Sequence, residues 1–364
     1  MDKLRVSCRG FQLAPSATQY GFSLVELMVG MVIALIGILV MAQIFALSEG
    51  QKRTTTTGTD AQVNGLLASF MIERDLRMAG YGIMGLGCAT INAYNQNRSP
   101  QNFSFSGLPV RIVTEATGND RIEIRYSTSA YGGMPATLQE PMPNSSANIR
   151  VNNGIGFQQG NMVIISQPPN DCAMVQLSQD GQQLGMANLT GPGTQWDLQH
   201  NPGGIYIFNP SGGQNVIFPV GGYGTGAKVT NFGTMANRAY YISNNKLVME
   251  DLNQPVGPGN PVDLVSGIVG LRAYYGLDTN SDGNLDLPFV NATAVPASET
   301  AIVAVRLALV ARSGLWERDE VSPASITLWN GGPTFDIPSN GEARHYRYKI
   351  YQTTVPIRNA IWNN

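Results

Sequence analysis

The chain has one long apolar run near its N-terminus. Residues 22–47 are almost wholly apolar, and about 20 consecutive apolar residues can span a bilayer as a helix. Lys3, Arg5 and Arg9 precede the run, and basic residues stay on the cytoplasmic side of a membrane. The pattern predicts a single-pass anchor that places the rest of the chain on the far side of the membrane.

Glu26 is the exception within this run. A carboxylate in a membrane-spanning helix costs about 2.5–3.5 kcal/mol on insertion scales, whereas a paired, hydrogen-bonded charge is tolerated in a low dielectric. The residue is therefore either a chance glutamate in an ordinary anchor or a carboxylate that gains a partner when the helix assembles with others.

An amphipathic pattern follows the anchor. The segment SEGQKRTTTTGTDAQVNG (48–65) is rich in Gly and Thr, which are weak helix formers, and we expect a frayed or kinked helix there. Apolar residues then recur at helical spacing until Gly80 and Gly82 end the helix. These apolar residues are Val63, Leu66, Leu67, Phe70 and Met71. We expect their stripe to lie against a folded head, because it has no other place to be buried.

The C-terminal part of the chain has the pattern of a β-rich head. Apolar segments bounded by Gly, Pro and Asn turns predict strands. These segments are 120–127, 161–167, 238–243, 268–277, 301–312 and 345–355. Residues 181–236 are long and turn-rich for one connection, which indicates an insertion or a small subdomain. The predicted fold class is α+β, with a long N-terminal helix over 22–82 packed on a β-rich head over 83–364.

Composition and charge argue against several other classes of function. Only 13% of the residues are charged and the net charge is −2, and no basic patch with interleaved aromatics is present, so we expect no nucleic-acid binding. The segment GGYGTGAK (221–228) lacks the spacing of a phosphate-binding loop. His200 and His345 come without a nucleophile motif and are interpreted as structural. We expect the chain not to be an enzyme.

The segment GFSLVELMVGMVIALIGILV (21–40) resembles the class III signal of type IV prepilins: a glycine, then a phenylalanine, then a glutamate four residues later, opening an apolar helix. In that family a prepilin peptidase cuts after the glycine and methylates the new N-terminus. The resemblance implies that residues 1–21 are a leader, cleaved after Gly21 to expose Phe22. It also implies that Glu26 pairs with a free amine where pilin helices pack side by side in the filament core.

Three further segments resemble the PilW family of type IV minor pilins. They are LLASFMIERDLRMAGYGIMGLGC (66–88), LVSGIVGLRAYYGLDTNSDGNLD (264–286) and YKIYQTTVPIRN (348–359). The resemblance implies a pilin-like fold and a subunit that joins a minor-pilin complex, which primes pilus assembly and sits at the tip. Such a subunit supports twitching motility, adhesion or DNA uptake.

The same resemblance implies the partners and the location of the chain. The partners are the other minor pilins, the major pilin, the prepilin peptidase and a tip adhesin. The chain is expected in the inner membrane, with its N-terminus cytoplasmic before cleavage and its head periplasmic, and later in the extracellular pilus. The alternatives are a type II secretion minor pseudopilin of J type and a membrane-anchored adhesive or binding protein.

One acidic loop is a candidate calcium site. The candidate ligands are Asp278, Asn280, Asp282, Asn284 and Asp286. They occupy positions one, three, five, seven and nine of an EF-hand-like loop, with Gly283 at position six. Phe289 stands at position twelve in place of the bidentate glutamate. Some pilins and secretion pseudopilins carry calcium in their heads, which adds to this prediction; the alternative is a polar hairpin turn.

Two of the three cysteines are candidates for a disulfide. Cys88 and Cys172 both follow the anchor and so lie in a translocated, oxidising compartment, where a disulfide persists. The alternative is a pair of buried thiols. Cys8 lies in the expected leader and would be lost with it.

Overall fold

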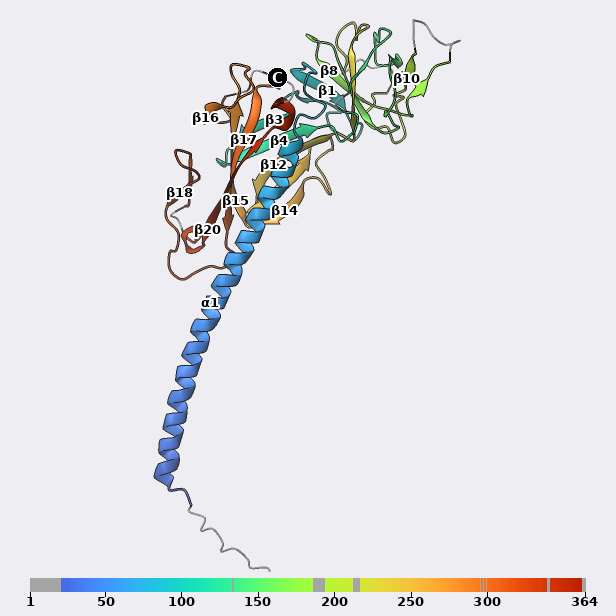
Figure 1. The fold of residues 1–364 in the computed structure, drawn as a ribbon. Helices are drawn as coiled ribbons and strands as arrows, with labels where there is room; N and C mark the ends of the chain where they lie inside the picture. The colour runs from blue at the N-terminus through green and yellow to red at the C-terminus, as the bar shows by residue number, and fades with distance from the viewer. Residues whose placement is uncertain are drawn as a thin grey trace, which may run out of the picture. The chain divides into compact units, whose positions relative to one another are not determined.

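The computed structural model describes residues 21–132, 134–185, 194–211, 217–294, 296, 298, 300–338 and 341–361. The chain divides into two units between Thr56 and Thr57. Helix α1 (Leu24–Met78) belongs to both units. All strands belong to the second unit, which is the head (Figure 1).

Helix α1 is continuous through the Gly- and Thr-rich segment, so the fraying predicted over 48–65 is wrong, while the kink predicted there stays a prediction. Thr or Gly costs at most about 1 kcal/mol per residue in a helix, too little to break one that extends on both sides. Thr55 Oγ1 donates to the Gln51 carbonyl at 2.9 Å, a bond made within the helix. Gly65 has a packing role, because a Cβ there would collide with the ring of Tyr351.

The face of α1 that packs on the head differs from the predicted stripe. The buried residues of this part of α1 include Ala61, Ala68, Ile72 and Leu76. The predicted residues Val63, Leu66, Leu67 and Phe70 are 56%, 61%, 41% and 63% exposed. Of the predicted stripe only Met71 packs against the core. The prediction is wrong because helical periodicity marks apolar positions without showing which of two apolar faces meets the head.

Next to α1, the head consists of two antiparallel sheets that share one hydrophobic core with the helix. The first sheet has the order β14-β13-β12-β4-β3. Its strands are β3 (Val110–Thr114), β4 (Asp120–Tyr126), β12 (Ala236–Ser243), β13 (Lys246–Asp251) and β14 (Val262–Ser266). The second sheet has the order β16-β15-β17-β20. Its strands are β15 (Ile268–Leu277), β16 (Asp286–Val290), β17 (Ile302–Arg312) and β20 (Tyr348–Pro356).

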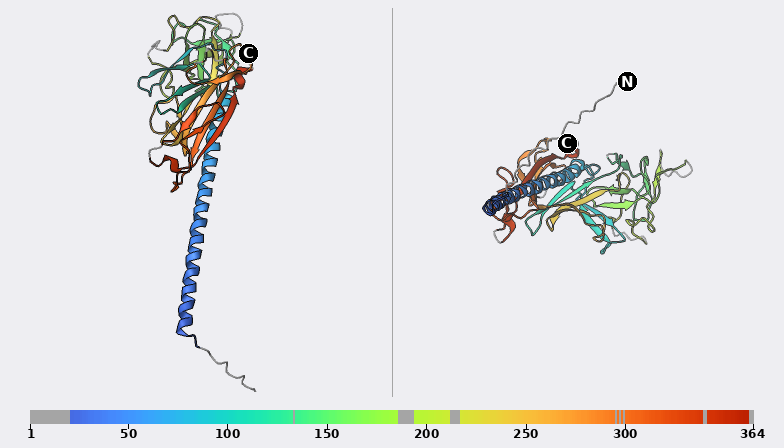
Figure 2. Two further views of the ribbon diagram at one scale, coloured as in Figure 1. Left: turned by 90° about the vertical axis from the view of Figure 1, so that its left-hand side faces the viewer. Right: turned by 90° about the horizontal axis from the view of Figure 1, so that it is seen from below.

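Most of the predicted strands in this part are confirmed, as β4, β12, β15 and β17. The strand predicted over 345–355 begins later, at Tyr348, because Ala343–His345 forms a 3₁₀ turn in which the His345 N–H donates to the Glu342 carbonyl at 3.1 Å. Figure 2 shows the C-terminal strands, in orange and red, beside the head part of α1. A short hairpin of β18 (Ser325–Thr327) and β19 (Thr334–Asp336) and the final helix α2 (Arg358–Ile361) complete this part.

The other part of the head has a six-stranded sheet of order β2-β1-β8-β7-β11-β5 and a three-stranded sheet of order β6-β10-β9. The six strands are β1 (Thr90–Tyr94), β2 (Asn102–Ser106), β5 (Ala136–Thr137), β7 (Met162–Ser166), β8 (Cys172–Gln176) and β11 (Lys228–Gly233). The three are β6 (Ile149–Val151), β9 (Gln182–Gln183) and β10 (Trp196–Leu198). The predicted strand at 161–167 is confirmed as β7.

The segment 181–236, expected as an insertion or small subdomain, is built into both sheets of this part. It contributes β9 and β10 to the smaller sheet and β11 to the larger one. β11 pairs with β7 and β5, which come much earlier in the chain. The segment is therefore an integral part of a larger substructure that begins at β1.

Candidate functional site

The N-terminal residues expected to be processed lie just before α1. Phe22 is 83% exposed and Ser23 caps the helix, because its Oγ accepts a hydrogen bond from the backbone N–H of Glu26 at 3.2 Å. Ser23 and Glu26 have the S-x-x-E spacing of a capping box. This signal is present in the sequence, although we did not predict a helix start from it. The carboxylate of Glu26 is also favourable at the positive end of the helix dipole. The expected leader, apart from Gly21, lies outside the described residues.

The first part of α1 is a candidate membrane span. Over Leu24–Lys52 the helix is long and apolar enough to cross a bilayer, with a mean hydropathy of 2.7 in an 18-residue window that has no buried residue. Large apolar side chains such as Leu27, Ile33 and Phe45 are 52%, 65% and 74% exposed. An apolar helix with side chains this exposed needs a bilayer or other helices around it. These properties are consistent with a membrane-anchored chain.

The head part of α1 is held on the first sheet by a buried carboxylate. Asp75 is 0% exposed and accepts hydrogen bonds from Arg238 Nη1 and the Tyr240 hydroxyl, each at 2.8 Å, and from the Tyr126 hydroxyl at 3.1 Å. Burial and the negative charge of Asp75 raise the pKa of Tyr126. We did not predict this cluster from the sequence, because the partners of Asp75 on β4 and β12 are 51 to 165 residues away along the chain.

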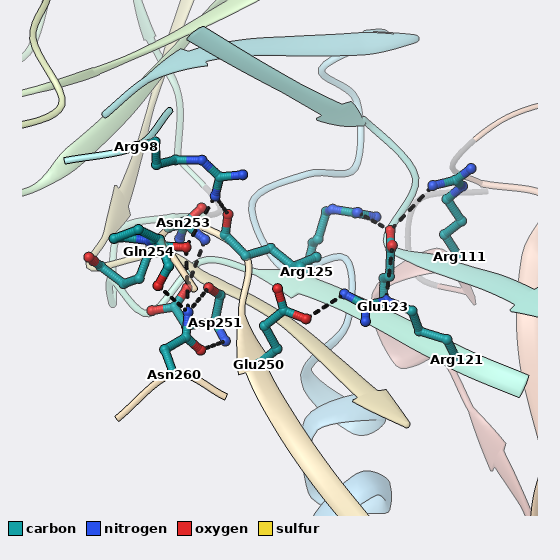
Figure 3. A network of polar contacts seen from close by, with 12 residues as sticks. Arg98, Arg111, Arg121, Glu123, Arg125, Glu250, Asp251, Asn253, Gln254 and Asn260 are labelled. Atoms are coloured by element: carbon teal, nitrogen blue, oxygen red, sulfur yellow. Dashed lines mark hydrogen bonds and ion pairs between the residues drawn. The ribbon is translucent and has the colours of Figure 1, made fainter. Parts of the chain in front are cut away.

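A second polar cluster joins the two parts of the head. Figure 3 shows Glu123 of β4 among Arg111, Arg121 and Arg125, with the first two at 3.7 Å from its carboxylate. Arg125 is 1% exposed; burial lowers its pKa, and the charge of Glu123 opposes this. The Arg125 guanidinium also lies over the ring of Phe105 on β2, 5.5 Å from its centroid. The ionic groups here have structural partners, which indicates a supporting role.

The predicted calcium loop folds around Asp278, which is 4% exposed. Its carboxylate accepts hydrogen bonds from the backbone N–H groups of Asp282 at 3.2 Å and Gly283 at 2.8 Å. Asp286 instead accepts from the backbone N–H and the hydroxyl of Thr279. Among the described residues, no three His, Cys, Asp or Glu side chains gather as a metal would require. Calcium binding by this loop stays a prediction, and direct coordination by Asp286 would require its carboxylate to turn away from Thr279.

The other candidate residues have clear structural roles. Cys88 and Cys172 form the predicted disulfide, with their Cα atoms 5.8 Å apart. His200 is buried and its Nε2 donates to the Ser145 carbonyl at 2.9 Å. His345 stacks on Trp316 at 4.9 Å between ring centroids. His345 lies in the 3₁₀ turn before β20, outside the strand that was predicted over 345–355.

Comparison with known proteins gives two family matches. The family model of the type IV pilus-assembly protein W matches residues 236–359, from the start of β12 into α2. The model of the prokaryotic N-terminal methylation motif matches residues 16–42, which include Gly21, Phe22 and Glu26. No protein with a curated description matches the chain.

One solved structure, a type IV-like pilin from Thermus thermophilus (TTHA1219), is similar to the chain. The match has 9% sequence identity and a TM-score of 0.29, and it covers 82% of this chain and 97% of the Thermus thermophilus chain. A TM-score this low does not establish a shared fold.

The two family matches cover different ends of the chain. One lies over the processing signal and the start of the apolar helix, and the other over the part of the head that packs on α1. Proteins of this family are structural subunits that assemble with other pilus components. The processing motif at the N-terminus and the C-terminal match to the type IV pilus-assembly protein W family together support a type IV minor pilin role for the chain.

Proposed function

We propose that this minor pilin enters a priming complex at the tip of the pilus through its N-terminal helix. The apolar half of α1 is held in the inner membrane before assembly, with the head in the periplasm, and is transferred to the helical core of the filament during assembly. The observation that supports this proposal best is Glu26, a carboxylate in the first turn of a helix whose apolar residues over the candidate span are not buried by the described part of the chain.

The chemistry of Glu26 fits assembly better than anchoring. Cleavage after Gly21 releases the α-amine of Phe22, and an amine is a natural partner for a carboxylate in a low dielectric. In a lone anchor the Glu26 carboxylate gains only the positive end of the helix dipole, because the bond to Ser23 is made by the backbone N–H of Glu26. Between subunits it pairs with the amine of a neighbouring helix, which aligns the two helices along their axes. The other minor pilins and the major pilin are the proposed neighbours.

The test replaces the carboxylate and separates membrane insertion from assembly. Glu26→Leu eases insertion of the helix by about 3 kcal/mol by transfer energetics, so the protein should reach the membrane and be cut after Gly21. It should then fail to support piliation and twitching in a strain that lacks the native protein. Glu26→Gln, which retains hydrogen-bonding capacity without charge, should also fail. Normal piliation by processed Glu26→Leu protein would contradict the proposal.

Two further variants serve as controls in the same strain. Glu49→Leu removes a carboxylate farther along α1, away from the α-amine, and should leave piliation normal. Gly21→Val places a larger side chain beside the cut and should leave an unprocessed precursor of higher mass on a blot. Mature-sized Gly21→Val protein would show that the cut lies elsewhere.

A further inference from the structure

The head contains several asparagines that are followed directly by glycine. Such a pair can react with itself, because glycine has no Cβ to shield its backbone nitrogen from the amide of the preceding side chain. Whether it reacts in a folded protein depends on the freedom of the two groups to meet. Three such pairs lie wholly in the described part of the chain, while Asn340 of a fourth lies outside it. The three are Asn64-Gly65, Asn153-Gly154 and Asn330-Gly331.

Two of these pairs are held away from reaction. Asn64 and Gly65 lie inside α1, where the backbone N–H groups are used in the hydrogen bonds of the helix, and Gly65 packs against the ring of Tyr351. In the second pair, Oδ1 of Asn153 accepts a hydrogen bond from the backbone N–H of Ile155 at 3.0 Å. Its glycine is buried beside the ring of Trp196. Reaction at either pair would therefore require local unfolding.

The third pair has none of these restraints. It lies between β18 and β19 of the short hairpin (Figure 1), in a turn that the Gly332 N–H closes by donating to the Trp329 carbonyl at 2.9 Å. Asn330 and Gly331 are both exposed, and no atom would lie within 4 Å of a Cβ at Gly331. Among the described residues, neither the Asn330 side chain nor the Gly331 N–H has a hydrogen-bond partner. The two reacting groups are therefore free to meet.

We propose that Asn330 is a site of spontaneous deamidation. The backbone nitrogen of Gly331 attacks Cγ of Asn330 and forms a cyclic imide, and the side-chain amide leaves as ammonia with the proton of the Gly331 N–H. Water then opens the ring at either carbonyl, which gives aspartate or isoaspartate. The only co-reactant is water, and no atom is oxidised or reduced. The modification does not depend on assembly of the protein into a pilus.

Both products change the tip of the hairpin. Aspartate places a negative charge on a neutral turn, and isoaspartate also adds one backbone carbon next to Trp329. This tryptophan is 6% exposed, lies edge-on to Tyr274 at 5.0 Å between ring centroids, and has the Arg306 guanidinium over its ring at 4.9 Å. Because Trp329 is part of the apolar cluster that joins the hairpin to β17, a lengthened turn loosens the hairpin. The reaction needs no enzyme, so the loosened fraction increases with the age of the subunit.

The first experiment measures the reaction at each pair in the same molecule. The processed full-length protein is incubated in detergent and mildly alkaline buffer made with oxygen-18 water, and its peptides are analysed by mass spectrometry. Asn330 should lose ammonia and gain one solvent oxygen about ten-fold faster than Asn64 and Asn153. Equal rates in the folded protein, or no solvent oxygen at Asn330, would overturn the inference.

Protein unfolded in urea is the control for this experiment. Without the fold, the three pairs differ little in local chemistry and should react at similar rates. A ten-fold preference for Asn330 that persists in urea would show that the neighbouring residues select the site, and would overturn its assignment to the structure of the hairpin.

The second experiment measures the effect on the hairpin. Amide hydrogen exchange over 325–336 is compared in fresh and aged wild-type protein and in aged Asn330→Gln, whose longer side chain forms a cyclic imide far more slowly. Exchange should be about ten-fold faster in aged wild-type protein and should stay at the fresh value in the variant. Exchange in β17 serves as the internal reference and should not change. Unchanged exchange over the hairpin after conversion of Asn330 would overturn the proposed loosening.

Discussion

Asp75 is the residue on which the contact between helix and sheet depends. Its carboxylate is fully buried and has donors from Tyr126 on β4 and from Arg238 and Tyr240 on β12. A buried ion pair adds little net stability compared with a well-packed apolar pair, but removing one member leaves the other charge and its donors without a partner. The cluster therefore specifies where α1 lies on the sheet.

Replacing Asp75 tests this role. Asp75→Ala should lower the free energy of unfolding by about 3 kcal/mol, because Arg238 and two tyrosine hydroxyls lose their acceptor. Thermal and urea unfolding of the purified protein measure the change. Arg77→Ala breaks only the exposed i,i+4 pair with Glu73 and should cost about 0.5 kcal/mol or less. Similar losses in the two variants would contradict a special role for Asp75.

The loop between β15 and β16 is the element on which a metal would act. Its carboxylates bond to backbone N–H groups within the loop, with Asp278 at the centre and Asp286 turned toward Thr279. Binding of calcium would require these oxygens to exchange N–H donors for the ion. The energetic gain then depends on how many oxygens converge, and Phe289 offers none at the twelfth position.

Removal of calcium tests this loop directly. If the loop binds calcium, a chelator should lower the melting temperature of the purified protein, because a ligand bound only by the folded state adds about 2.7 kcal/mol at a hundred times its Kd. Asp278→Ala with Asp282→Ala should abolish the calcium-dependent part, and Asp319→Ala, at an exposed site, should retain it. Identical melting curves with calcium and with chelator would show that the loop is a polar turn.

The disulfide connects two elements of the six-stranded sheet. Cys88 precedes β1 and Cys172 begins β8, and the two strands pair in parallel. A bond that joins residues separated by 84 positions should contribute about 3–5 kcal/mol in the chain-entropy model. Replacing both cysteines by alanine should lower stability by this amount.

Thiol labelling provides an independent measurement of the disulfide. Processed, folded protein should react with a maleimide only after reductant and denaturant are added, since both cysteines are buried. The single variant Cys88→Ala should expose the thiol of Cys172 once the protein is unfolded without reductant. Labelling of both cysteines in unreduced, unfolded wild-type protein would mean that the bond is absent.

At the scale of the whole molecule, the head should respond to acid through His200. Burial lowers the pKa of this histidine, whose Nε2–H donates to the Ser145 carbonyl. The ordinary pKa, about 6.5, applies to the unfolded chain. Below that pH the unfolded state binds a proton that the folded state does not. The free energy of unfolding should therefore fall as the pH drops from about 7 toward 5.

His200→Gln tests the source of this pH dependence. Glutamine keeps a donor for Ser145 and has no proton to gain, so the variant should lose much of the change in melting temperature over this pH range. His345→Gln is the matched control, since that histidine is partly exposed and stacks on Trp316. An equal effect of the two substitutions would rule out His200 as the group responsible.

Local patterns and composition determine many features of this protein's structure, and the sequence alone predicts them. The anchor, Glu26 and the processing motif depend on neighbouring residues, and strands such as β4, β15 and β17 have their pattern within their own ten or so residues. The disulfide was also predictable, since only two cysteines follow the anchor and their compartment is oxidising. Each of these features has its cause within a short stretch of chain or in the environment.

The remaining features, such as which face of α1 is buried, depend on long-range contacts that only the tertiary structure shows. The sequence could not show that α1 buries the face with Ala68 and Ile72 and leaves Phe70 outside, because both faces have helical periodicity. It could not show that Gly65 makes room for Tyr351 where we expected a frayed or kinked helix, or that the 181–236 segment adds β11 to the sheet that contains β7. Periodicity determines that a helix or strand has an apolar side, whereas which surface that side meets depends on residues a hundred or more positions away.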